Sequence, residues 1–102
     1  MRESEKIKVY ADPDLRDIIP LFLAHKREEI EQIRQALLIQ DFKAVFFIAH
    51  QIKGSGGGYG FDAITEIGKE IEEAAAGRNE PMILKCMDKL ADYLERIEVV
   101  YE

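Results

Sequence analysis

The residues best suited to chemistry lie in one run, His50-Gln51-Ile52-Lys53-Gly54-Ser55-Gly56-Gly57-Gly58-Tyr59-Gly60. On a helix, residues three, four and seven positions apart share one face, so His50, Lys53, Gly54 and Gly57 are expected to lie together. That face carries an imidazole, an ammonium group and almost no bulk. A core would place large apolar side chains there, and an ordinary surface would place good helix formers. The pattern therefore predicts a surface kept clear for another molecule.

A glycine-rich run can also bind nucleotide phosphates, but this one fits neither common motif. In every frame of G-x-G-x-x-G, a residue other than glycine takes the last position. The adjacent lysine, Lys53, precedes the glycines, whereas a Walker motif needs it after them. The run also follows a helical pattern and not a strand. Nucleotide binding is therefore not expected.

Metal chemistry and hydrolysis lack the residues that they need. The chain has one cysteine, Cys86, and two histidines, His25 and His50, with no His or Cys four residues from either histidine. No base, orienting group and oxyanion hole can be picked out near Ser55. We expect no metal or cofactor in this chain and no complete catalytic site.

The remaining chemistry for His50 is that of a phosphoryl acceptor. An exposed imidazole has a pKa of ~6.5, so near pH 7 it is largely neutral and nucleophilic. Phosphoryl transfer depends mainly on in-line approach and charge neutralisation. Lys53 can supply one positive charge, and Gly54 and Gly57 leave room for a partner's active site with its own carboxylates and metal. Gly56 falls on the apolar stripe instead, where access and close helix packing are equally good explanations.

The elements that position this run are predicted to be helices. The 102 residues, 47% of them hydrophobic, suit one compact domain. The apolar spacing and capping residues predict an all-α fold over residues 12–102: an antiparallel up-down four-helix bundle with a short additional N-terminal helix. The expected starts are Asp12-Pro13 for the short helix, then Pro20, Asp41, Asp62 and Asn79-Pro81, with the last helix continuing through Ile97 and Tyr101. Residues 1–11 are expected to be flexible, and no strand is predicted.

Within the helix that follows Asp41, the side chains divide into a buried stripe and an exposed row. The stripe consists of Phe42, Val45, Ala49, Ile52, Gly56 and Tyr59. His50 is one residue off this stripe, so its ring is predicted to be accessible, in a row with Lys43, Phe47, Gly54 and Gly57. Two groups of charged residues are assigned to solvated faces: Lys26, Arg27, Glu28, Glu29 and Glu31 on the preceding helix, and Glu70, Glu72 and Glu73 on the following one.

Charge and composition exclude several classes of function. The formal net charge of -6 disfavours binding to nucleic acid and to anionic lipid. The sequence has no run of eighteen apolar residues, no signal-peptide core and a single cysteine, which predicts a cytoplasmic protein without disulfides. No unpaired apolar stripe is evident, so a monomer is expected.

The segment Ala49-His50-Gln51-Ile52-Lys53-Gly54-Ser55, followed by Gly60 and a helix with Ile64, Ile67 and Glu72, resembles the signature of the histidine phosphotransfer (HPt) domain of bacterial phosphorelays. The resemblance extends over roughly residues 12–100 and includes Ile19-Pro20-Leu21-Phe22. It implies a four-helix bundle with an exposed phosphohistidine at His50. Lys53 matches the family's lysine near the phosphohistidine, and Gly54 matches its small residue that gives access.

The resemblance also implies a function and partners. The chain is expected to be a phosphocarrier, with no kinase or hydrolase activity of its own, that exchanges phosphoryl groups with aspartates of response-regulator receiver domains and with a sensor histidine kinase. Mg²⁺ would come from the receiver. Phe47, Gly54, Gly57 and Ser55 are the expected docking residues. A buried position is an equally good prediction for Phe47, and filling a small-residue slot is the commoner explanation for a serine such as Ser55. Phe46 and Phe47 occupy positions at which relatives often carry charged or polar side chains.

Two other functions remain open at this point. One is a helical module that docks receiver domains without being phosphorylated, and the presence of His50 argues against it. The other is the detached phosphoacceptor domain of a chemotaxis-type kinase. No ATP-binding segment is present in the sequence, and the Met1 start with four complete helical patterns favours a free-standing protein.

Overall fold

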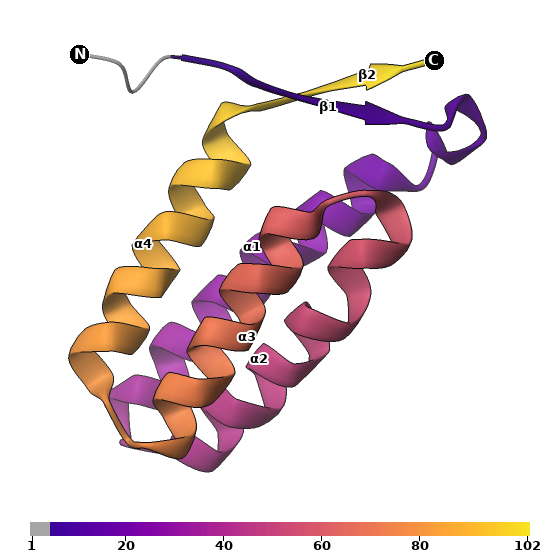
Figure 1. Ribbon diagram of the computed structural model, residues 1–102. Helices are drawn as coiled ribbons and strands as arrows, with labels where there is room; N and C mark the ends of the chain where they lie inside the picture. Colours follow the sequence, from indigo (N-terminus) through magenta and orange to yellow (C-terminus); the bar gives the residue numbers. More distant parts are fainter. Residues whose placement is uncertain (1–4) are drawn as a thin grey trace.

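Four helices make up most of the protein, shown in Figure 1 as a computed structural model that describes residues 5–102. They are α1 (Ile19–Leu38), α2 (Phe42–Gly56), α3 (Asp62–Ala76) and α4 (Glu80–Arg96). The chain reverses direction at each connection, so neighbouring helices run antiparallel (Figure 1). The predicted helical bundle is thus present. Within residues 5–102, no helix combines the length and the apolar character needed to cross a bilayer.

The helix ends follow from residues that satisfy free backbone groups. Asp41 accepts a hydrogen bond from the Ala44 N–H at 3.0 Å, and Asn79 accepts one from the Met82 N–H at 3.2 Å. Each cap satisfies a donor that has no partner within its helix. At Gly60 the backbone has a φ of 88°, a left-handed conformation that glycine adopts without strain, and this residue turns the chain from α2 into α3.

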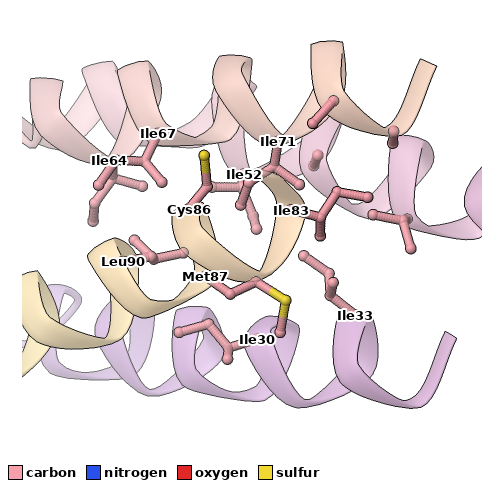
Figure 2. Close-up of a cluster of buried hydrophobic side chains, with 14 of the residues drawn as sticks. Ile30, Ile33, Ile52, Ile64, Ile67, Ile71, Ile83, Cys86, Met87 and Leu90 are labelled. Atoms are coloured by element: carbon pink, nitrogen blue, oxygen red, sulfur yellow. The ribbon is translucent and has the colours of Figure 1, made fainter. Parts of the chain in front are cut away.

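The core fills the space between the four helices (Figure 2). Facing apolar side chains from all four helices meet there, as the predicted stripes require. They include Ile30 and Ile33 of α1, Ile52 of α2, Ile64, Ile67 and Ile71 of α3, and Ile83, Cys86, Met87 and Leu90 of α4. The single thiol, Cys86, is therefore buried.

Two strands correct the all-helical prediction. β1 (Ile7–Ala11) and β2 (Ile97–Tyr101) form a parallel pair, which lies across the end of the bundle in Figure 1. The prediction that Ile97 and Tyr101 extend the last helix was wrong, since α4 ends at Arg96. A run of β-branched and aromatic residues favours extended backbone once another strand lies beside it.

The N-terminal expectations were also wrong in part. Residues 1–11 were predicted to have no regular element, but Ile7–Ala11 is a strand; residues 1–4 lie outside the described part. The short leading helix is only one turn of 3-10 helix, Pro13–Leu15. Asp12 caps it as predicted, by accepting a hydrogen bond from the Asp14 N–H at 2.8 Å. The tight turn joins β1 to the loop before α1.

Candidate functional site

His50 lies on the exposed side of α2, where 61% of its side chain is open to solvent. The other members of the predicted outward row are exposed as well: Lys43, Phe47, Gly54 and Gly57. Phe47 is 62% exposed, which decides between its two predicted positions in favour of the surface. The accessible row predicted from the sequence is therefore present in the fold.

The ring of His50 is held from one side by Glu72 of α3. His50 Nδ1 lies 2.7 Å from Glu72 Oε2, and Lys53 Nζ lies 2.8 Å from Glu72 Oε1. The carboxylate thus bridges the imidazole and the ammonium group. Only 11% of the Glu72 side chain is exposed, compared with 34% for Lys53. The three side chains form one polar cluster at the α2–α3 seam, which we call the His50 triad.

The charge of Glu72 determines which nitrogen of His50 is free. Hydrogen bonds from Lys53 and then from His50 lower the pKa of the Glu72 carboxyl, so it is ionised at neutral pH. An ionised carboxylate can only accept hydrogen bonds, so Nδ1 must be the nitrogen that carries the proton. In the neutral imidazole the lone pair is then on Nε2. The contact with Glu72 makes Nε2 the nucleophilic atom.

A close approach of two backbones places Glu72 within reach of His50. A Cβ atom at Gly68 of α3 would lie 2.7 Å from the Lys53 nitrogen of α2, so only glycine fits at this crossing. Glu72 follows Gly68 by four residues and therefore lies one turn further along the same face of α3. Gly68 thus determines how closely the Glu72 carboxylate approaches His50 and Lys53.

Glu72 does not share a solvated face with Glu70 and Glu73, so the prediction from the sequence was wrong for this residue. Glu72 is buried, with 8% of its surface exposed, whereas Glu70 and Glu73 are exposed. A signal was present in the sequence. Thr65, Gly68 and Glu72 recur at intervals of three and four, and two small residues in such a row are typical of a helix face that meets another helix.

The glycines of the run do not share one role. A Cβ at Gly54 would meet nothing within 4 Å, whereas a Cβ at Gly56 would lie 2.9 Å from both Phe61 O and Thr65 N. Gly56 is therefore a packing residue against the start of α3. Gly57 is exposed and begins the 3-10 turn Gly57–Tyr59, where a Cβ would make an ordinary 3.7 Å contact with Thr65 Oγ1.

Ser55 differs from the other predicted docking residues because its hydroxyl points toward α1. It accepts a hydrogen bond from Lys26 Nζ at 2.8 Å and donates one to Ile52 O at 3.3 Å. Lys26 and Glu29 were both assigned to the wet side of α1, and this was wrong: each is only 2% exposed. These residues line a hollow of about 390 Å³ between α1 and α2, together with His25, Gln51 and Gly54.

The second histidine lies in a different setting. The His25 ring lies on the surface of α1, with Nδ1 3.4 Å from Glu28 and Nε2 3.5 Å from Glu29, so acceptors flank both of its nitrogens. Lys26 Nζ lies 2.6 Å from the same Glu29 carboxylate, but Lys26 is only 2% exposed, so its charge is not open to an incoming group as that of Lys53 is. Across residues 5–102, no three His, Cys, Asp or Glu side chains gather as a set of metal ligands.

The fold and the site together define a helical bundle with an exposed histidine that is hydrogen-bonded to a carboxylate and accompanied by a lysine. In a comparison with protein families, the family model described as "Hpt domain" matches residues 17–99. The chain belongs to the Hpt domain family. No curated protein and no solved structure matches it. The match identifies the family and with it phosphotransfer in two-component signalling.

Proposed function

We propose that this protein is a phosphorelay carrier that accepts a phosphoryl group on His50 Nε2 and passes it to a receiver-domain aspartate. The observation that supports this most is the 2.7 Å contact between His50 Nδ1 and the ionised carboxylate of Glu72. In the neutral ring this contact leaves the free lone pair on Nε2, while 61% of the side chain stays open to a partner. A nucleophile that must be reached by another protein needs both properties.

The transfer requires no proton movement on this chain. The Nε2 lone pair attacks phosphorus, an Nε2–P bond forms, and the bond between phosphorus and the aspartate oxygen breaks to release the carboxylate. The ring keeps its proton on Nδ1 and so becomes cationic next to Glu72. The ion pair stabilises this charge, and the reverse reaction regenerates the neutral ring. The same geometry therefore serves both acceptance and donation.

Lys53 contributes positive charge beside the phosphoryl oxygens. Its ammonium group is paired with Glu72, but about a third of the side chain is exposed, which leaves it accessible to an incoming phosphoryl group. A single partly exposed charge is screened by solvent, so the partner must supply most of the neutralisation. In a receiver domain this comes from acidic side chains that hold Mg²⁺. Gly54, Gly57 and the exposed ring of Phe47 form the contact surface on this chain.

The test is transfer of radiolabelled phosphate from a phosphorylated receiver to His50→Gln, with His25→Gln as the matched control. The His25→Gln variant should accept label at the wild-type rate, and His50→Gln should accept none. Folding of both should be unchanged, since both side chains are largely exposed. Persistent acid-labile label on His50→Gln would contradict the proposal. Binding of the receiver without labelling of the wild type would indicate a docking module instead.

A further inference from the structure

A buried ionic group ties the glycine-rich end of α2 to α1. Lys26 Nζ donates a hydrogen bond to Ser55 Oγ at 2.8 Å and lies 2.6 Å from Glu29 Oε1, in an ion pair without hydrogen-bond alignment. Lys26 and Glu29 are each 2% exposed. We call Lys26, Glu29 and Ser55 the buried clamp. Buried charges of this kind are seldom a source of net stability, because desolvation offsets much of the attraction.

The clamp also contacts the aromatic side chains around the end of α2. The Lys26 ammonium group lies 5.0 Å from the centre of the Phe22 ring. That ring in turn packs against Tyr59 at 4.7 Å and Phe61 at 5.6 Å between centroids. Tyr59 and Phe61 flank Gly60, where the chain turns toward α3. The clamp and these rings therefore hold both sides of the glycine-rich segment against α1.

The segment held in this way needs an external restraint. Glycine loses more backbone freedom on folding than any other residue, and five of the seven residues at positions 54–60 are glycine. On the α3 side, the restraint is the close approach of Gly68 to the Lys53 backbone. On the α1 side, it is the hydrogen bond from Lys26 to Ser55. The backbone of Lys53 is held at the first restraint, two residues before the second one at Ser55 and one turn from His50.

We infer that Lys26 is a positioning residue for phosphotransfer: acting through Ser55, it fixes the α2 turn that carries Lys53 and so keeps the His50 triad in place. This inference rests on the proposed phosphorylation of His50. Lys26 does not touch the reacting atoms, since its side chain is only 2% exposed and its ammonium group is hydrogen-bonded to Ser55. Lys26 affects transfer by restraining the conformation of residues 52–57.

The most informative variants remove the hydrogen bond between Lys26 and Ser55 while nearly preserving the volume of the side chains. Ser55→Ala removes the acceptor on α2 and leaves the ion pair. Lys26→Met with Glu29→Gln removes both charges together, so that neither is left buried alone. We expect both to slow transfer about 10-fold, as small displacements of positioned groups do. Amide exchange in residues 54–60 should accelerate by a similar factor. Lys26→Arg, which keeps the cation, should restore most of the rate.

The matched control is Glu31→Gln with Arg34→Met, which removes an exposed ion pair from the same helix. It should change neither transfer nor exchange. The inference would be overturned if Ser55→Ala and the double variant showed faster amide exchange in residues 54–60 but transferred at the wild-type rate. It would also be overturned if their amide exchange were unchanged. If Ser55→Ala or the double variant Lys26→Met with Glu29→Gln unfolds, Lys26→Arg provides the test. A folded Lys26→Arg protein with unaltered amide exchange and tenfold slower transfer would also overturn the inference. A wild type that takes no label on His50 would overturn the proposed function itself.

Discussion

Gly54 and Gly56 are two residues apart on α2, and replacing each with alanine should change stability in opposite directions. At Gly54 the added methyl group meets open space, so the variant should gain ~0.4–1 kcal/mol from the reduced entropy of the unfolded chain. At Gly56 the methyl group would lie 2.7 Å from Thr65 Oγ1 and 2.9 Å from two backbone atoms. Backbone moves less easily than a flexible side chain, and overpacking of this kind costs about 1–3 kcal/mol.

These free energies convert into melting temperatures that are easy to separate. For a domain of this size, 1 kcal/mol corresponds to about 4–8 °C. Gly54→Ala should therefore melt about 2–8 °C above the wild type. For Gly56→Ala, the gain in helix propensity offsets part of the clash, and the remaining loss of about 1–2 kcal/mol should lower the melting temperature by roughly 4–16 °C. Urea unfolding at one pH supplies an independent value of each free energy.

A third variant, Gly54→Leu, separates stability from access. The side chain points to solvent, so the bundle should stay folded, but it fills the space beside His50 and should slow transfer from a receiver at least 10-fold, about 1.4 kcal/mol. If Gly54→Ala is destabilised, or if Gly54→Leu remains folded and transfers normally, the argument that this glycine provides access is wrong. A stable Gly56→Ala would refute the assigned contact with α3.

Three further predictions concern Lys53 and Glu72 of the triad and Gly68 beside it. Lys53→Ala should slow transfer ~10-fold without abolishing it, because a partly exposed charge is screened, and rates unchanged at both low and moderate salt would contradict its role. The depressed pKa of Glu72 means that its stabilisation is fully present above the ordinary carboxyl range of ~4.3 and is lost as pH falls through the lowered value. Urea unfolding of Glu72→Gln should therefore differ from that of the wild type at pH 6 and converge toward it at pH 3; a constant difference would count against the ion pair. Gly68→Ala should be destabilised by about 1–3 kcal/mol and should also slow transfer, since α3 must move away from α2; thermal melts and transfer assays test both.

The helices could be predicted from the sequence because the signals that define them are local. Asp41 and Asn79 each cap a backbone N–H three residues further along, and Gly60 supplies the left-handed turn between α2 and α3. The apolar stripes have helical spacing over about three turns or more. The exposure of His50 followed from its position one residue off such a stripe. Each of these features depends on residues less than two turns apart.

The strands could not be predicted in the same way, because their pairing is nonlocal. Ile7 pairs with Ile97, and neither segment has a partner nearby in the sequence. Ile97 and Tyr101 also fit the spacing of the stripe in α4, so a helical continuation matched the local pattern equally well. The contact between the two strands decides between these conformations. It exists only after the bundle has brought the two ends of the chain together.

The charged residues illustrate the same limit. Lys26 and Glu29 look like surface residues in the sequence, since each has charged neighbours on α1. They are buried because Ser55 of α2 offers a hydrogen-bond partner for the ammonium group. Glu72 likewise became part of the site only through the approach of α3 to α2. A charged side chain can be buried where its partner lies on another helix, and the local spacing does not contain that partner.

On the proposed mechanism, Glu72 matters more after the phosphoryl group arrives than before. If the phosphorylated ring lost its Nδ1 proton, the imidazole would be a poor leaving group, and the protein would not release the phosphoryl group to a receiver. The adjacent carboxylate keeps the proton in place, because a negative charge that accepts a hydrogen bond from Nδ1 stabilises the cationic ring. Glu72→Gln should therefore slow donation to a receiver more than acceptance from one. Equal slowing in both directions would show that Glu72 only orients the ring. Measuring the two half-reactions separately, from phosphorylated receiver and from isolated phosphoprotein, distinguishes these roles.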